Sequence, residues 1–295
     1  MNILFKKVAI IGVGLIGGSL AMVLRKKGLA NYIVGIGRGI ANLEAAKRLG
    51  VVDEFTQDHK AGVKGADLVV IAIPVGSIAR MVADIATSLQ DGTIVTDVGS
   101  VKGPVVKEIE EKLPERVFFV GGHPIAGTED AGVEAAFPTL FEGRKCILTP
   151  TLKTNPEALQ KVRAIWGAAG SVVVLMDADR HDEMLAGISH LPHIIAYALV
   201  NTVKGFDEGI LGYSAGGFRD FTRIASSPPE MWRDICLMNR DAILDTVERF
   251  QKTLEVLKGL IEKGDGVGLF EEFMKAKGVR DAIKTVVSNL TASGR

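Results

Sequence analysis

The amino-acid sequence predicts an α/β protein in which a doubly wound parallel sheet is followed by an all-α domain. Three observations support this prediction. From residue 8 to residue 175, short β-branched runs alternate with amphipathic stretches at the spacing of strand–helix–strand units. The runs are continuously apolar, as expected for parallel strands that helices cover on both faces. After Met176 no further β-branched run of any length occurs, and the pattern becomes helical.

The expected elements follow from these patterns. Strands are expected at residues 8–11, 32–36, 68–73, 93–98, 117–120, 145–148 and 172–175, with helices at 15–27, 40–49, 77–89, 105–113 and 156–168. Three later helices are expected at 180–203, 229–260 and 268–290, and Pro192 should kink the first of them. The change of pattern divides the chain into a sheet domain, 1–176, and a helical domain, 177–295.

Composition excludes several classes of protein. The 295 residues are 47% hydrophobic and 24% charged, which is typical of a globular protein and not of a disordered chain. Lysine and arginine (35) balance aspartate and glutamate (35), so the net charge of zero argues against nucleic-acid binding. Two cysteines suit a reducing compartment. With no signal peptide and no apolar run of membrane-spanning length, we expect a cytoplasmic protein without membrane contact.

Residues 12–17 spell G-V-G-L-I-G, a G-x-G-x-x-G pattern between an expected strand and an expected helix. In this setting Gly12 permits a tight turn, Gly14 lets the backbone approach a pyrophosphate, and Gly17 allows close packing of helix on strand. The first helical residues, Leu15 and Ile16, would direct their amide groups at the phosphates. The pattern therefore predicts a Rossmann-type site for NAD or NADP.

The end of the second strand bears on which of the two cofactors binds. Enzymes that use NAD usually have Asp or Glu about 20 residues after the glycines, bonded to the ribose 2′-hydroxyl. Here Gly37 occupies that position and Arg38 follows it. A guanidinium can bind the 2′-phosphate of NADP, so the sequence favours NADP or dual use. Arg38 could instead stack on the adenine, an interpretation that leaves NAD open.

Polar side chains follow the fourth and fifth strands, where ligands bind in this type of sheet. Ser100 and Lys102 follow the fourth strand, and His123 follows the fifth. Histidine is the best of these as a proton acceptor, because its usual pKa is near neutrality. His190 and His193 are three residues apart and share a helical face, where substrate contact or core packing is expected. No third ligand is in register with them, so no metal site is expected.

Five motifs in the same order resemble the prephenate dehydrogenase family over nearly the whole chain. They are G-V-G-L-I-G-G-S at 12–19, D-V-G-S-V-K at 97–102, H-P-I-A-G at 123–127, H-L-P-H at 190–193 and D-F-T-R-I-A at 220–225. The resemblance implies oxidative decarboxylation of prephenate to 4-hydroxyphenylpyruvate, with hydride transfer to NAD(P)+, in tyrosine biosynthesis. Arogenate, converted to tyrosine by the same chemistry, is the alternative substrate.

The resemblance also implies roles for particular residues. His123 would accept the proton of the substrate's C4 hydroxyl, Ser100 would bond the same hydroxyl, and Arg223 would hold a substrate carboxylate. The other implied substrate contacts are His193, Gly216, Trp232, Thr128, Glu129 and Asp220, and the cofactor contacts are Gly12, Gly14, Leu15, Ile16, Gly17, Arg38, Ile73, Pro74 and Ser100. A homodimer formed by the helical domain is expected, in which the partner subunit is a candidate source of Gly216.

Departures from the family's pattern and rival interpretations remain. Gly37 stands where many NAD-using relatives carry an acidic residue, and neither an ACT domain nor a chorismate mutase domain is expected after the helices. One rival is a β-hydroxyacid-type dehydrogenase, which needs a catalytic lysine on a helix; Lys204 is the only lysine in the long helix and no motif supports it. The other rival is a non-catalytic dinucleotide sensor, against which His123, Ser100 and Arg223 argue.

Overall fold

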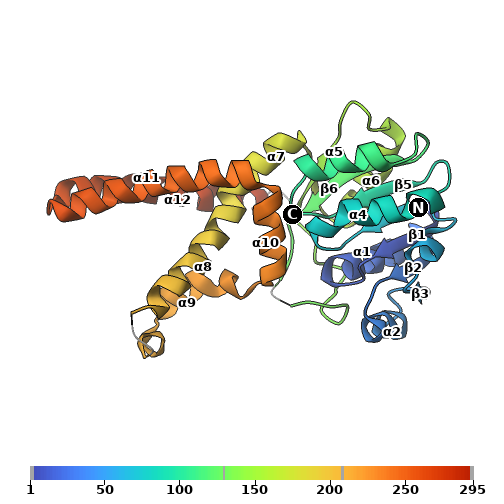
Figure 1. Ribbon diagram of the computed structural model, residues 1–295, viewed down its shortest axis with the longest axis horizontal. Helices are drawn as coiled ribbons and strands as arrows, with labels where there is room; N and C mark the ends of the chain where they lie inside the picture. The colour runs from blue at the N-terminus through green and yellow to red at the C-terminus, as the bar shows by residue number, and fades with distance from the viewer. Residues whose placement is uncertain (1–2, 129, 207–208, 293–295) are drawn as a thin grey trace. The chain divides into compact units, whose positions relative to one another are not determined.

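A computed structural model of the chain describes residues 3–128, 130–206 and 209–292. Its first part folds around an eight-stranded sheet with helices on both faces (Figure 1). The strands are β1 Phe5–Ile11, β2 Ala30–Ile36, β3 Glu54–Thr56, β4 Leu68–Ile71, β5 Ile94–Asp97, β6 Phe118–Pro124, β7 Lys145–Thr149 and β8 Val172–Leu175. Their order across the sheet is β3-β2-β1-β4-β5-β6-β7-β8.

Strands β1 to β6 run parallel, as the continuously apolar runs predict. Strand β1 lies between β2 and β4, so the winding of the chain reverses there. In such sheets the crevice at the carboxyl ends of the strands, at this reversal, is where ligands bind. Strand β7 pairs with β6 in the antiparallel direction, and β8 runs parallel to β7.

Strand β6 is longer than the sequence predicts, and this corrects the place of His123. The apolar run ends at Val120, but Gly121 to Pro124 continue the strand by pairing with β7, where His123 lies opposite Ile147. Glycines are poor strand formers, so the hydrogen bonds of the neighbouring strand hold this segment extended. His123 therefore lies inside β6 and not in a loop after it.

Helices pack on both faces of the sheet. Helices α1 Leu15–Lys26, α2 Ile40–Arg48 and α6 Pro156–Ala168 contribute to one core, and α3 His59–Val63, α4 Val75–Ile85 and α5 Gly103–Lys112 contribute to the other. In β1, Val8 and Ile10 enter the first core, whereas Ala9 and Ile11 enter the second. The sequence misses β3 and α3, which are too short to show a period, and α4 ends early, in the 3-10 turn Ala86–Ser88.

After β8 the described chain is helical, as predicted. The elements are α7 Ala178–Leu185, a π-helical segment η2 Ala186–His190, α8 Leu191–Lys204, η3 Ile210–Tyr213, α9 Gly216–Thr222, η4 Arg223–Ser226, α10 Pro229–Met238, α11 Arg240–Glu262 and α12 Gly266–Ala292. The helix expected at 229–260 is broken at Asn239. Pro192 does not end the helical run from Ala178 to Lys204. The π-helical segment accommodates it, with the Leu191 N–H bonded to the Ala186 carbonyl five residues back.

The run Ala178–Lys204 bears on the expectation that no segment spans a membrane. It has 27 residues, and an 18-residue window within it has a mean hydropathy of 1.2, so by length and composition it could cross a membrane. The indication of a membrane-spanning helix rests on length and composition alone. Helices buried in soluble proteins share both properties, and this run carries the buried polar residues His181, Asp182 and His190.

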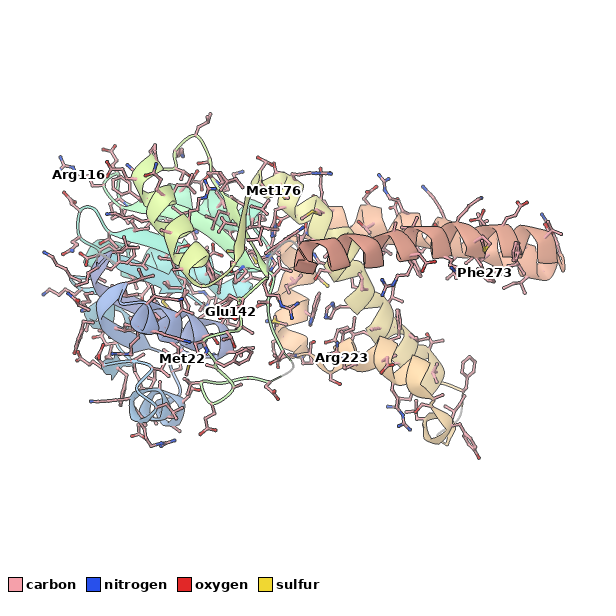
Figure 2. The ribbon with its side chains drawn as sticks, turned by 180° about the vertical axis from the view of Figure 1, so that it is seen from behind. Met22, Arg116, Glu142, Met176, Arg223 and Phe273 are labelled. Atoms are coloured by element: carbon pink, nitrogen blue, oxygen red, sulfur yellow. The ribbon has the colours of Figure 1, made fainter. Side chains whose placement is uncertain are left out.

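The chain separates into two compact units, one ending at Arg240 and the other beginning at Asp241. The first unit contains the sheet and helices α1 to α10. In Figure 2, Met176 marks the point in this unit where the sheet gives way to helices. The second unit contains most of α11 and α12, and large apolar side chains such as Leu254, Phe270 and Phe273 are exposed on it. A domain boundary near residue 177 stays a prediction.

Candidate active site

The glycine-rich loop has the backbone that a dinucleotide site needs. Gly12 has a φ of +95°, and a Cβ there would collide with the carbonyl oxygen of Ala72 at the end of β4. A Cβ at Gly17 would collide with the carbonyl oxygen of Gly12, so α1 can pack this close to β1 only with glycine. At Gly14 nothing lies within 4 Å of the Cβ position, which leaves room for a ligand to approach the backbone.

Helix α1 begins directly after this open position. Gly14 is its N-cap, and no side chain caps the first turn. The backbone N–H groups of Leu15 and Ile16 therefore have no side-chain acceptor. A pyrophosphate at this helix end would supply it and would meet the positive end of the helix dipole. The residues present therefore fit the phosphates of NAD or NADP.

Asn42 on α2 holds the glycine-rich loop from behind and was not identified from the sequence. Its Nδ2 donates a hydrogen bond to the carbonyl of Val13 (2.7 Å), and its Oδ1 accepts one from the backbone N–H of Val133 (2.9 Å). Val133 belongs to the segment between β6 and β7. The same segment reaches α1, where the Ser19 hydroxyl accepts the backbone N–H of Phe137 (3.0 Å). One amide side chain thus joins the cofactor loop to the segment that follows His123.

The other predicted cofactor contacts lie around this loop. The side chain of Ile73 approaches the Cβ position of Gly12 to 2.9 Å, and Pro74 precedes the first turn of α4. At the end of β2, Gly37 is half-buried and Arg38 is exposed, with its carbonyl bonded by Gln57. A Cβ at Gly37 would lie 3.5 Å from Leu43, an ordinary contact, so a larger residue fits there.

His123 stands at the head of a chain of hydrogen bonds. Its Nδ1 lies 2.8 Å from Nε2 of His181 on α7, and the two rings meet edge to face at 5.1 Å. The Nδ1 of His181 lies 2.7 Å from Oδ1 of Asp182. Ser100, half-buried, follows β5, the strand next to β6. Burial lowers the pKa of His123 well below its usual value, and the nearby His181 and Lys102 lower it further.

Asp182 is fixed by the start of α5 as well as by His181. Its Oδ1 accepts the backbone N–H of Lys102 and its Oδ2 accepts that of Gly103, each at 2.8 Å. These amides belong to the first turn of α5, which has no side-chain cap of its own. A carboxylate from α7 thus caps α5 and orients the His181 ring at the same time.

A second cluster lies on α8 and α10. His193 stacks on Trp232 with ring centroids 3.6 Å apart, and its Nδ1 donates to the carbonyl of Ser189 (2.9 Å). His190 meets the same indole edge to face at 6.0 Å, so the two histidines do share a face. Asn239, at the break before α11, donates to the carbonyl of Asp182 (2.8 Å) and contacts Nδ1 of His190 (3.1 Å). The Nε2 of His190 and the Nε1 of Trp232 are buried without a hydrogen-bond partner among the described residues.

The remaining predicted substrate residues are exposed. Gly216 and Asp220 lie on α9, and Arg223 begins the turn η4 that follows it (Figure 2). Both elements pack against α8, which carries His193. Thr128 is exposed in the segment after β6, and Glu129 lies outside the described residues. The structure therefore brings His123, Ser100 and the glycine-rich loop to one edge of the sheet but does not enclose the α9 residues.

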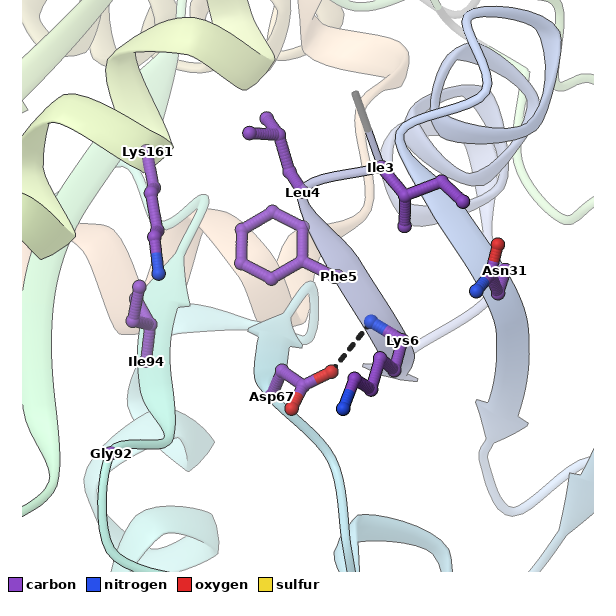
Figure 3. A pocket seen from close by; sticks show the side chains of 9 residues that line it. All are labelled: Ile3, Leu4, Phe5, Lys6, Asn31, Asp67, Gly92, Ile94 and Lys161. Atoms are coloured by element: carbon purple, nitrogen blue, oxygen red, sulfur yellow. Dashed lines mark hydrogen bonds between the residues drawn. The ribbon is translucent and has the colours of Figure 1, made fainter. Parts of the chain in front are cut away.

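A hollow of about 370 Å³ lies elsewhere, at the amino ends of the strands (Figure 3). Phe5 and Ile94 form part of its wall, with Lys161 from α6 and Asp67 before β4. The Asp67 carboxylate already accepts the backbone N–H groups of Lys6 and Lys7 at 2.6 and 3.0 Å. Ligands of this type of sheet bind at the opposite, carboxyl edge, so we do not place the active site here.

Comparison with known proteins decides the family. Residues 20–175 match the model of the prephenate dehydrogenase nucleotide-binding domain, and residues 177–276 match that of the prephenate dehydrogenase dimerization domain. The chain belongs to the prephenate dehydrogenase family. Membership identifies it as a dehydrogenase with a nucleotide-binding domain, and the resemblance drawn from the five motifs is confirmed.

Individual prephenate dehydrogenase relatives cover nearly the whole chain. The prephenate dehydrogenase of Bacillus subtilis is 39% identical over 96% of this chain and 77% of its own length. The cyclohexadienyl dehydrogenase of Zymomonas mobilis is 38% identical over 95% of this chain and 97% of its own. The crystal structure of the Aquifex aeolicus prephenate dehydrogenase in complex with hydroxyphenyl propionate and NAD+ has a TM-score of 0.89, at 40% identity, covering 94% of this chain and 98% of that one.

Several residues of this candidate site were not predicted from the sequence. His181 lies 58 positions from His123, and Asn239 lies 57 positions from Asp182, so no local motif links them. The dipeptide of His181 and Asp182 near the start of an expected helix was the available signal. An acidic residue beside a histidine on a helix is common. Only the hydrogen bond between His181 and His123 connects this dipeptide to the candidate site.

Proposed function

We propose that the chain oxidatively decarboxylates prephenate to 4-hydroxyphenylpyruvate, with hydride transfer to NAD(P)+, as a step of tyrosine biosynthesis. Arogenate, which would give tyrosine, is the alternative substrate. The observation that carries the proposal is the imidazole of His123, hydrogen-bonded to His181 at the sheet edge where the glycine-rich loop also lies. Ser100 follows the adjacent strand at the same edge, as a hydroxyl partner for the substrate requires.

The chain's own residues would hold the cofactor at the glycine-rich loop. Gly12, Gly14 and Gly17 shape the loop, and the uncapped amides of Leu15 and Ile16 would bind the pyrophosphate. Ile73, Pro74 and Ser100 would lie along the nicotinamide half. When bound, the nicotinamide supplies the hydride acceptor.

His123 would act as the base. The C4 hydroxyl of prephenate becomes the phenol hydroxyl of the product, so the balanced reaction releases no proton. His123 would take the hydroxyl proton while the C4–H bond and the bond to the ring carboxylate break, and would return it to the same oxygen. This role needs a neutral imidazole, and the lowered pKa of His123 keeps the ring neutral at pH 7.

The α8–α10 region would bind the rest of the substrate. Arg223 would pair with a carboxylate, for which a guanidinium is the preferred partner. His193 and Trp232 would line the side-chain end, with Gly216, Thr128, Glu129 and Asp220 around them. The buried donors of His190 and Trp232 that lack a protein partner support a polar ligand at this place, because such groups are rarely left unpaired.

We propose NADP or dual cofactor use from the residues at the end of β2. Gly37 presents no carboxylate to a 2′-phosphate, and the exposed Arg38 can reach one. The variant Gly37→Asp tests this, since a Cβ fits at that position without collision. It should raise KM for NADP+ at least tenfold and leave KM for NAD+ unchanged or lower. An unchanged ratio of the two KM values would assign Arg38 to adenine stacking.

We further propose a cytoplasmic homodimer, with residues 1–176 binding the dinucleotide and residues 177–295 binding substrate and dimerising. The match to a dimerization domain supports the dimer. Exposed apolar side chains on the helical elements, such as Ile188, Leu237 and Phe273, support it too, because a monomer would leave them in water. The exposure of Gly216 and Arg223 in one chain agrees with a site completed by a partner subunit.

The deciding experiment is a four-way assay of the purified protein. Prephenate or arogenate is supplied with NAD+ or NADP+, and reduced nicotinamide is followed by absorbance. Turnover with either substrate establishes the reaction and fixes both preferences. The variant His123→Asn should lower kcat by about 10²- to 10⁴-fold and leave the dissociation constant of the cofactor nearly unchanged. Silence in all four mixtures, with the cofactor still bound, would favour another dehydrogenase reaction or a non-catalytic sensor.

A further inference from the structure

We propose that His181 and Asp182 are positioning residues that hold His123 as the Nδ1–H tautomer, so that its Nε2 is the proton acceptor, and that they stabilise the ring while it carries the substrate's proton. The proposal rests on the proposed function, in which His123 is the base. It adds to that function the reason why Nε2 of His123, and not Nδ1, accepts the proton.

The direction of the hydrogen bonds gives the tautomer. The Asp182 carboxylate only accepts, so the Nδ1 of His181 must donate to it across 2.7 Å. In the neutral ring the Nε2 of His181 is then an acceptor, and it lies 2.8 Å from the Nδ1 of His123. His123 must therefore carry its proton on Nδ1, which leaves the lone pair on Nε2.

The geometry resists rotation of either ring. The His181 side chain is completely buried, and the Asp182 carboxylate is held by two amides of α5 as well as by the ring. If the proton of a neutral His123 moved to Nε2, its Nδ1 would face another acceptor and the hydrogen bond would be lost; if the ring rotated by 180°, a carbon would take the place of Nδ1. Fixed groups of this kind stabilise developing charge without reorganising during the reaction.

The charges around His123 show why a protonated ring needs help. Burial disfavours a positive charge on His123, and the ammonium of Lys102 before α5 disfavours it further. Asp97 is engaged by Lys102, with which it forms a buried ion pair. Among the residues that the structure describes, Asp182 is thus the anion that reaches His123 through a hydrogen-bonded path. We infer that it compensates the charge during the step in which His123 holds the proton.

If His181 served only to hold the helices together, its substitution would have different effects from those expected of a positioning residue. The tie between α7 and α5 runs through the two bonds from Asp182 to the amides of Lys102 and Gly103, in which the His181 ring takes no part. Changing the ring while keeping Asp182 therefore separates positioning of His123 from assembly of the helices.

The test compares His181→Leu with His181→Gln in the full-length protein. A glutamine oxygen can accept the Nδ1–H of His123, whereas leucine cannot. We expect His181→Leu to lower kcat by about 10²-fold or more with KM changed less than threefold, and His181→Gln to recover at least tenfold of the loss; loss of the equivalent orienting group in a catalytic triad costs about 10⁴-fold. Equal kcat values for both variants and the wild type would overturn the proposal. So would equal losses in the two variants.

A second measurement does not depend on turnover and so separates this proposal from the proposed function. The chain contains only five histidines, so ¹⁵N spectra of histidine-labelled protein can be assigned with single His→Gln variants. We expect His123 in the wild type to show a protonated Nδ1 and an unprotonated Nε2 at pH 7.5, and His181→Leu to show a mixture of tautomers. A protonated Nε2, or a mixture already in the wild type, would reject the proposal even if the enzyme turns over.

Discussion

Lys102 and Asp97 form an ion pair, and both of their side chains are completely excluded from solvent. The Lys102 ammonium also donates to the carbonyl of Gly122 (2.9 Å), and Asp97 accepts the N–H of the same residue (3.1 Å). Gly122 immediately precedes His123 in β6. The pair therefore joins the end of β5, the start of α5 and the strand that carries the proposed base.

Removing one partner of this pair should strongly destabilise the fold. We expect Lys102→Met to lower the free energy of unfolding by about 3–5 kcal/mol, because Asp97 would remain buried and uncompensated. Urea unfolding measures the change. The matched control is Lys60→Met, which breaks an exposed pair with Asp84 (3.5 Å) and should cost less than about 1 kcal/mol. A Lys102→Met protein as stable as the wild type would show that the pair contributes little.

The proposed carboxylate contact predicts a specific kinetic change. Arg223→Ala should mainly raise KM for the substrate, by about tenfold or more, because the ion pair is present in the ground state and in the transition state alike. Arg223→Lys should fall between, since it keeps the charge but loses the bidentate geometry. Arg116→Ala removes an exposed arginine that pairs with Asp91 and serves as control. An unchanged KM in Arg223→Ala would remove this residue from the substrate site.

Stability should fall as the pH is lowered, because the buried His190 and the half-buried His193 and His123 are held neutral. Burial lowers the pKa of His190 to about 4, and it also lowers the pKa of His193 and His123. As the pH falls below 6.5, the unfolded chain takes up protons that the folded chain does not, so the stabilisation is complete above pH 6.5 and is lost towards pH 4. For His190 this amounts to on the order of 3 kcal/mol. Urea unfolding between pH 7.5 and 4.5 measures the slope, which should be shallower in His190→Gln. An identical slope would contradict the prediction.

The link made by Asn42 should matter for cofactor binding. We expect Asn42→Ala to raise the dissociation constant of the dinucleotide by about tenfold, because it removes two hydrogen bonds worth roughly 0.5–1.5 kcal/mol each from the support of the glycine-rich loop. At saturating cofactor, kcat should change little. Calorimetric titration measures the affinity, with Asn31→Ala, an exposed residue of β2, as control. An affinity equal to that of the wild type would mean that the loop keeps its shape without Asn42.

The sequence predicted those parts of the site that depend on neighbouring residues. The pattern from Gly12 to Gly17 is short enough that its turn, its open backbone and its helix start are all local properties, and the structure shows each of them. The apolar runs likewise predicted the order of β1, β2, β4, β5, β6, β7 and β8 along the chain. The match to two prephenate dehydrogenase domain models confirms the family that the motifs indicated.

Tertiary structure decided what depends on distant segments. The extension of β6 through His123 requires the ladder with β7, and the glycines there give no strand signal of their own. The proton arrangement of His123 depends on His181 and Asp182, which arrive on another helix and have no spacing rule that ties them to β6. By itself the sequence determined the fold class and the local motifs, because periodicity and turn chemistry act over a few residues. The partners of each buried polar group were decided by packing, because their hydrogen bonds form only when the helices meet the sheet.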